Sequence, residues 1–102
     1  SDGNQREHQI RDAITSWNHP MITETRGKGL LLGFGLNTEN FDVPEGITPA
    51  GYLCKELMAN SLLTVPAGPE TLRWLPPLNV TEAEVAEALE ILKNTLDSLV
   101  KN

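Results

Sequence analysis

Cysteine is almost missing from the sequence, since Cys54 is the only one among 102 residues. A single cysteine cannot form a disulfide within the chain and fits a reducing compartment, so we expect a cytoplasmic protein. A secretory signal peptide is not expected either, because the opening residues SDGNQREHQ do not pass from a charged to an apolar segment. The apolar runs elsewhere are far too short to cross a bilayer, so we predict no membrane partner.

Positive charge is scarce. Eight Lys and Arg residues stand against 14 Asp and Glu residues, which gives a net charge of −6, and the basic residues form no run. A protein that binds nucleic acid needs a basic surface that matches the phosphate backbone. We therefore expect no nucleic-acid partner.

Patterns for metal binding or nucleophilic catalysis are also lacking. His8 and His19 have no cysteine or carboxylate at ligand spacing, so we predict no metal site. Cys54 falls on the apolar face of an expected helix and is interpreted as a small core residue. The segment RGKG (26–29) is too short for a phosphate-binding loop and is predicted to be a tight turn. The sequence thus predicts no catalytic residue in this chain.

Apolar residues at intervals of three and four predict three helices. The first covers residues 4–17 and ends before Pro20, because the residue that precedes a proline avoids the helical conformation. The second follows the N-cap Thr48 and ends at Asn60, which we expect in the left-handed conformation. The third begins with a capping box made by Thr81 and Glu84. The apolar faces comprise Ile10, Ala13, Ile14 and Trp17, then Ala50, Leu53, Cys54, Leu57 and Met58, and finally Val85, Leu89, Leu92, Leu96 and Leu99.

Alternating apolar residues between turn segments predict four short strands. The first starts at Ile22 and is followed by residues 30–36, 62–66 and 71–76. In the last strand, Leu72 and Trp74 face one side and Arg73 the other. The order of elements is α-β-β-α-β-β-α. We predict an α+β fold with one domain, residues 1–102, in which a small antiparallel sheet of about four strands has helices packed on one side.

Arg73 is a lone charge in the middle of an otherwise apolar strand, and two explanations remain open. It can form a structural ion pair, or lay its stem on apolar surface with its guanidinium in water. Alternatively, the guanidinium can bind the carboxylate of a ligand, because its planar fork donates two parallel hydrogen bonds and keeps its charge. Composition and spacing do not decide between them.

Two segments carry a family resemblance: TRGKGLLLGFGL (25–36) and LLTVPAGPETLRWLPPLNVTEAEVAEALEIL (62–92). From about Ile22 to Leu99, the chain resembles the C-terminal small domain of class III (ornithine-type) pyridoxal-phosphate aminotransferases, and the acetylornithine branch has the most similar pattern. The pairing of VPAG with LRWLPPL and a T-E-x-E helix start is the specific part. Trp74 stands where the family often has phenylalanine.

The resemblance implies a role for Arg73. In the family, the arginine of the LR-x-x-PPL segment binds the α-carboxylate of the substrate. Pyridoxal phosphate is held upstream, in a large domain that supplies a lysine, an acidic partner for the ring nitrogen and a phosphate cup. None of the lysines here lies in that context, whether Lys28, Lys55, Lys93 or Lys101. We therefore expect that the 102 residues alone bind no pyridoxal phosphate and are inactive.

The resemblance also implies partners and a reaction. The partners would be a large cofactor-binding domain, absent from this sequence, and small amino-acid and 2-oxo-acid substrates, within a homodimeric parent enzyme. The parent would transfer the amino group of N-acetylornithine to 2-oxoglutarate in arginine biosynthesis; ornithine, succinylornithine and 4-aminobutyrate stay open as donors. The alternative is a stand-alone module that binds a small carboxylate or serves in assembly without catalysis. If a large domain is the partner, we expect an exposed apolar surface beside Arg73 that includes Trp74 or parts of VPAGP (65–69).

Overall fold

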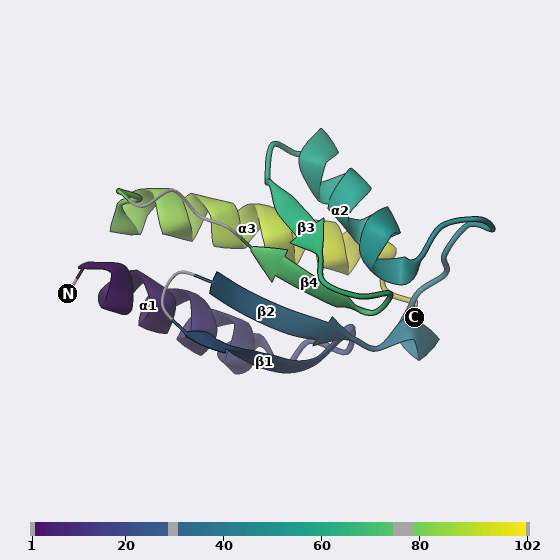
Figure 1. Ribbon diagram of the computed structural model, residues 1–102, viewed down its shortest axis with the longest axis horizontal. Helices are drawn as coiled ribbons and strands as arrows, with labels where there is room; N and C mark the ends of the chain where they lie inside the picture. The colour runs from purple at the N-terminus through teal and green to yellow at the C-terminus, as the bar shows by residue number, and fades with distance from the viewer. Residues whose placement is uncertain (1, 29–30, 75–78, 102) are drawn as a thin grey trace.

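The computed structural model describes residues 2–28, 31–74 and 79–101, and the side chains of residues 5–25, 33–74 and 79–101. Helix α1 (Asp2–Trp17) leads into strands β1 (Ile22–Lys28) and β2 (Leu31–Leu36). A short 3-10 helix, η1 (Thr38–Asn40), precedes helix α2 (Pro49–Ala59). Strands β3 (Thr64–Pro66) and β4 (Thr71–Trp74) and helix α3 (Glu82–Leu99) complete the chain. This order confirms the predicted α+β fold (Figure 1).

The four strands form one antiparallel sheet in the order β1-β2-β4-β3. Strand β4 therefore lies inside the sheet and is hydrogen-bonded to a neighbour on each side. Leu72 of β4 lies opposite Phe34 of β2, and Arg73 lies opposite Gly33 of β2 and Val65 of β3. Directly opposite residues share a face of the sheet. This register puts Arg73 on the face that Leu72 does not use.

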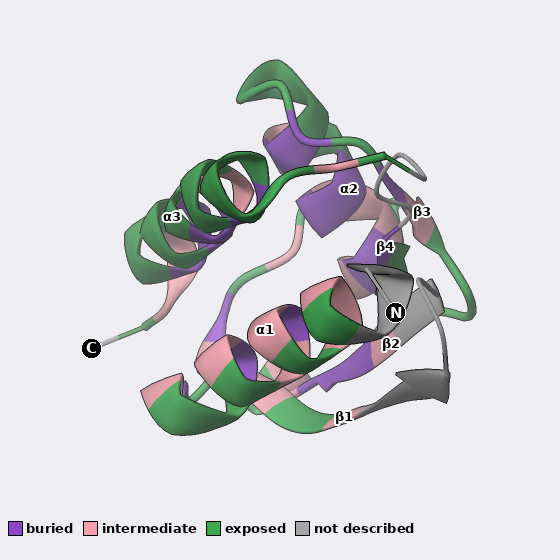
Figure 2. Ribbon diagram, turned by 90° about the vertical axis from the view of Figure 1, so that its left-hand side faces the viewer, coloured by how far each residue is buried: buried purple, intermediate pink, exposed green. Residues whose placement is uncertain are grey.

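The three helices all lie on one side of the sheet, as predicted (Figure 2). The strands alternate accordingly, because successive side chains of a strand point to opposite faces. Phe34, Leu72 and Trp74 point into the layer beneath the helices and are 0%, 0% and 3% exposed. Arg73 points the other way and is exposed. The sheet thus has one covered apolar face and one face that none of the described helices covers.

Helix α3 begins with the predicted capping box. Thr81 Oγ1 accepts a hydrogen bond from the backbone N–H of Glu84 at 3.1 Å, and Glu84 Oε1 accepts one from the backbone N–H of Thr81 at 2.9 Å. These bonds satisfy N–H groups that have no partner within the helix. The bond from the Thr81 backbone, and then that from its side chain, lower the pKa of Glu84. Along the helix, the predicted apolar face is buried at Val85, Leu89, Leu92 and Leu96.

The end of α2 differs from the prediction. Asn60 has a φ of −103°, and the left-handed residue is Ser61, with a φ of 70°. Asn60 instead closes the helix by donating from its side-chain amide to the carbonyl of Glu56 at 3.0 Å. Met58 is 60% exposed rather than buried, because the face that meets the sheet ends at Leu57.

The strand boundaries also need correction. Strand β1 continues to Lys28, so the segment RGKG is largely strand and the predicted turn cannot occupy all of it; residues 29 and 30 lie outside the described residues. Strand β3 starts at Thr64, two residues later than predicted, because the chain is still leaving α2 at Leu62 and Leu63. The predicted end of the last strand, residues 75–76, also lies outside the described residues.

Candidate functional site

Strand β4 holds Arg73 near the centre of the uncovered face of the sheet. Its side chain is exposed and makes no hydrogen bond or ion pair within the part of the chain that the structure describes. A structural ion pair, which was one explanation for this arginine, therefore finds no support among the described residues. The guanidinium is available to an anion from elsewhere.

The immediate surroundings of Arg73 are small and only partly apolar. Gly33 and Val65 flank it on the neighbouring strands, and the next pair on the same face is Thr71 with Gly35. At Gly35, a Cβ atom would collide with Oγ1 of Thr23 in β1. The space beside Gly35 is therefore occupied by Thr23, whereas Gly33 presents no side chain to Arg73.

The surface beside Arg73 agrees with only one of the two alternatives that we expected for it. Trp74 is only 3% exposed, because the alternation of β4 turns it toward the helices. The exposed large apolar residues in the described part of the chain are Ile47, Met58 and Leu63, none of them in β4. Residues 66–69 of the VPAGP segment are exposed, so that part of the expectation holds.

A second polar cluster joins the connection between α1 and β1 to helix α3. The side chain of His19 is 5% exposed, and its Nε2 lies 2.8 Å from Oδ1 of Asp97. Its Nδ1 accepts a hydrogen bond from the backbone N–H of Met21 at 3.1 Å. Nδ1 therefore carries no proton, and Nε2–H donates to the carboxylate. Lys93 binds the other carboxylate oxygen at 3.1 Å.

This His19–Asp97 pair could not be predicted from the sequence. The two residues are 78 positions apart, and neither belongs to a local motif. Only the packing of α1 against α3 brings them together. Because both ring nitrogens of His19 are already engaged within the chain, we interpret the cluster as a structural tie between the α1–β1 connection and α3.

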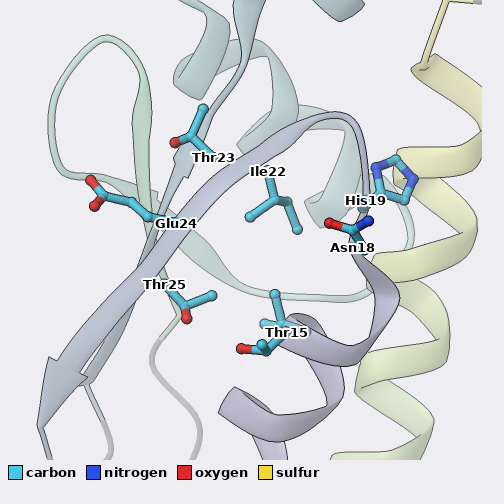
Figure 3. A pocket seen from close by; sticks show the side chains of 8 residues that line it. Thr15, Asn18, His19, Ile22, Thr23, Glu24 and Thr25 are labelled. Atoms are coloured by element: carbon cyan, nitrogen blue, oxygen red, sulfur yellow. The ribbon is translucent and has the colours of Figure 1, made fainter.

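A cavity of about 210 Å³ lies between the end of α1 and the first half of β1 (Figure 3). Its ionisable residues are His19, which is engaged, and the acid Glu24, so it offers no cation to a carboxylate. A second cavity of about 290 Å³ lies between Asn60 and α3. Arg73 lines neither cavity. The first is lined by Ile14, Thr15, Asn18, His19, Ile22, Thr23, Glu24 and Thr25.

The lysines whose side chains the structure describes provide no recognisable place for pyridoxal phosphate. Lys93 and Lys101 form surface ion pairs, with Asp97 and with Asp42 at 3.2 Å. Lys55 is exposed on α2, and none of these three lysines lines either cavity. The side chain of Lys28 lies outside the described side chains. That the chain alone binds no cofactor stays a prediction, and no step of a reaction is assigned to these lysines.

Among the described residues, neither a metal site nor a reactive thiol is indicated. In the described ranges, no group of three His, Cys, Asp or Glu residues could hold a metal ion. Cys54 is 7% exposed within the core, as predicted, and burial raises the pKa of its thiol. A raised pKa leaves less of the nucleophilic thiolate. Among the described helices, none has the length and apolar character needed to cross a membrane.

Comparison with known proteins gives the context of the Arg73 face. No family model matches the chain. The acetylornithine aminotransferase of Synechocystis sp. is 42% identical over 98 residues, which are 93% of this chain and 21% of that protein. The ornithine aminotransferase of Staphylococcus carnosus is 32% identical over 84 residues, which are 82% of this chain and 19% of that protein. The crystal structure of acetylornithine aminotransferase from Elizabethkingia anophelis superposes with a TM-score of 0.82 at 29% identity, over 96% of this chain and 25% of that one.

The chain is homologous to the C-terminal region of class III aminotransferases of the acetylornithine and ornithine type. This confirms the family resemblance seen in the sequence. Aminotransferases of this family depend on pyridoxal phosphate. The chain spans about a fifth of the length of the curated relatives that it matches.

Proposed function

We propose that the chain is the C-terminal small domain of an acetylornithine-type aminotransferase and that Arg73 binds the substrate α-carboxylate there. One observation supports this role above all: the guanidinium is exposed and has no anionic partner among the described residues, yet its backbone is fixed in an inner strand. Homology to the C-terminal region of these enzymes supplies the setting.

The chemistry of the proposed role is positioning. In the complete enzyme, pyridoxal phosphate supplies the electron sink for amino-group transfer when it is bound. The contribution of this chain is to hold one end of the substrate. Two parallel hydrogen bonds from Arg73 fix both the place and the plane of the carboxylate. Holding the carboxylate also orients the amine for reaction, which can supply a large part of a rate enhancement.

The uncovered face of the sheet is where we place the partner of this domain. A large cofactor-binding domain of the same polypeptide would cover it, in a homodimeric, cytoplasmic enzyme of arginine biosynthesis. Trp74 and the other core residues point away from this face. The contact would therefore rely on hydrogen bonds and on the flat backbone around Gly33 rather than on a large apolar patch.

A stand-alone module that binds a small carboxylate, or serves in assembly, is the second candidate. The observation that favours it is the completeness of the core. Phe34, Leu53, Leu57 and Val85 are 0% exposed without any contribution from another domain. Such a core supports a domain that exists by itself, with Arg73 as a carboxylate site on its surface.

The test uses the complete gene product that carries these 102 residues, purified with pyridoxal phosphate. We expect it to transfer the amino group of N-acetylornithine to 2-oxoglutarate, in preference to ornithine, succinylornithine or 4-aminobutyrate as donors. Arg73→Lys should raise KM for both substrates, because lysine keeps the charge but loses the fork. Loss of a charged hydrogen bond costs about 1.5–3 kcal/mol, or roughly ten- to a hundred-fold in kcat/KM.

The matched control is Arg11→Lys, the same exchange at an arginine of α1 that pairs with Glu7. It should leave kcat/KM unchanged. Unchanged kinetics in a folded Arg73→Lys enzyme would end the carboxylate assignment. A complete gene product that shows no transamination but binds small carboxylates through Arg73 would favour the stand-alone module.

A further inference from the structure

Arg73 has two cross-strand neighbours that differ in size. On β2 it faces Gly33, which has no side chain, and on β3 it faces Val65, which is half-buried and branched at Cβ. The Cβ atoms of directly opposite residues lie about 4.5–5.5 Å apart. Val65 therefore limits the space into which the stem of the arginine can lean, whereas Gly33 adds no side chain that would do so.

The two directions also lead to different parts of the sheet. Strand β2 is an inner strand, whereas β3 is an edge strand. A stem that leans over Gly33 carries the guanidinium over the middle of the uncovered face. A stem that leans the other way meets the methyl groups of Val65, which are stiff at χ1, and would carry the charge to the rim.

We propose that Gly33 and Val65 are positioning residues that direct the guanidinium of Arg73 over β2 and so fix where the substrate carboxylate is bound. The proposal rests on the proposed function of Arg73 and deepens it. Gly33 adds no side chain of its own in one direction, and the branched side chain of Val65 obstructs the other. The place of the carboxylate is then set by steric contacts on the sheet, and no acidic side chain in the described part of the chain competes with the ligand for the guanidinium.

The test uses the complete gene product with its cofactor. Gly33→Val should raise KM for the carboxylate substrates about tenfold while kcat stays within about twofold, because the new side chain displaces the guanidinium. Gly33→Ala should give a smaller rise in KM. Gly33 lies within a regular strand, so other residues can adopt its backbone conformation. Thr71→Val, on the same face and without added bulk beside Arg73, is the control and should leave KM unchanged.

A double-mutant cycle separates positioning from a general structural effect. In an Arg73→Lys background, Gly33→Val should raise KM by less than about twofold. Equal increases with and without the arginine would overturn the positioning role. If Gly33→Val fails to fold, Gly33→Ala and Val65→Ala test the positioning role in its place. An unchanged KM in both of these variants would also overturn that role.

These experiments distinguish a failure of this inference from a failure of the proposed function of Arg73, on which it rests. A raised KM in Arg73→Lys together with an unchanged KM in folded Gly33→Val overturns only the role of Gly33. An unchanged KM in Arg73→Lys overturns the carboxylate assignment and the positioning role together.

Discussion

Asp97 is half exposed on α3, yet its carboxylate has two partners. The hydrogen bond from His19, and then that from Lys93, lower its pKa from the ordinary value of 3.8. The fold therefore favours the charged form, so the stabilisation is present above about pH 4 and is lost as the pH falls through the lowered pKa. We expect the Tm of Asp97→Asn to fall less steeply between pH 4 and pH 2 than that of the unchanged chain.

Thermal melts followed by circular dichroism at a series of pH values measure this effect. The difference between the two proteins is the quantity of interest, because Glu84 also has a lowered pKa and titrates in both. Glu90→Gln, on the exposed side of α3, is the control and should keep the slope of the unchanged chain. Identical slopes for Asp97→Asn and the unchanged chain would show that the His19 tie does not favour the charged carboxylate.

At the scale of single residues, the sequence predicted features that depend on a local pattern. It did not predict contacts that form only when distant segments pack together. Arg73 could be found because alternation within four residues sets it apart from Leu72 and Trp74. The same alternation excludes Trp74, one of the two alternatives that we expected at the exposed surface, because Trp74 shares the covered face with Leu72. The His19–Asp97 pair could not be found, because it depends on the angle at which α1 meets α3.

Helix α3 is the element that we expect to contribute most to stability. Leu92→Ala should lower the free energy of unfolding by about 2–5 kcal/mol, because Leu92 is 1% exposed and its loss leaves a cavity. Thr81→Ala should lower it by about 1 kcal/mol, through the lost cap. Asn94→Ala, at an exposed position of the same helix, should stay within about 0.5 kcal/mol.

Urea unfolding at pH 7 measures the free energy of unfolding of all three α3 variants. A Leu92→Ala protein as stable as the unchanged chain would mean that α3 does not pack on the core in solution. A loss as large for Asn94→Ala as for Thr81→Ala would mean that the cap has no specific role.

Elements with their own start and stop signals were predicted well, and elements bounded by their neighbours were not. Thr48 and Thr81 mark the starts of α2 and α3 through side-chain hydrogen bonds that local sequence encodes. The end of β1 is set instead by its pairing with β2, which reaches as far as Lys28 with Leu31. Glycines in RGKG suggested a turn, but pairing with a neighbouring strand outweighs that local preference.

The molecule as a whole has one core, to which all three helices and the inner strands β2 and β4 contribute. The 102 residues should therefore unfold in one cooperative transition. They should not bind pyridoxal phosphate at a specific lysine, since Lys93 and Lys101 are held in surface ion pairs and Lys55 is exposed. Mixing with the cofactor, reduction with borohydride and peptide mass spectrometry should show only scattered, substoichiometric labelling. Stoichiometric labelling of one lysine would contradict this.

The strand order has a consequence for how the chain assembles in time. Strands β1 and β2 are adjacent in sequence and can pair early, whereas β2 must wait for β4 until α2 and β3 have been made. Pairing between segments far apart in sequence is slow, because the intervening loop must close first. Until then, the inner edge of β2 has no partner. Arg73 and Gly33 come together only when β4 pairs with β2, so we expect the proposed carboxylate site to be completed at the slowest step in building the sheet.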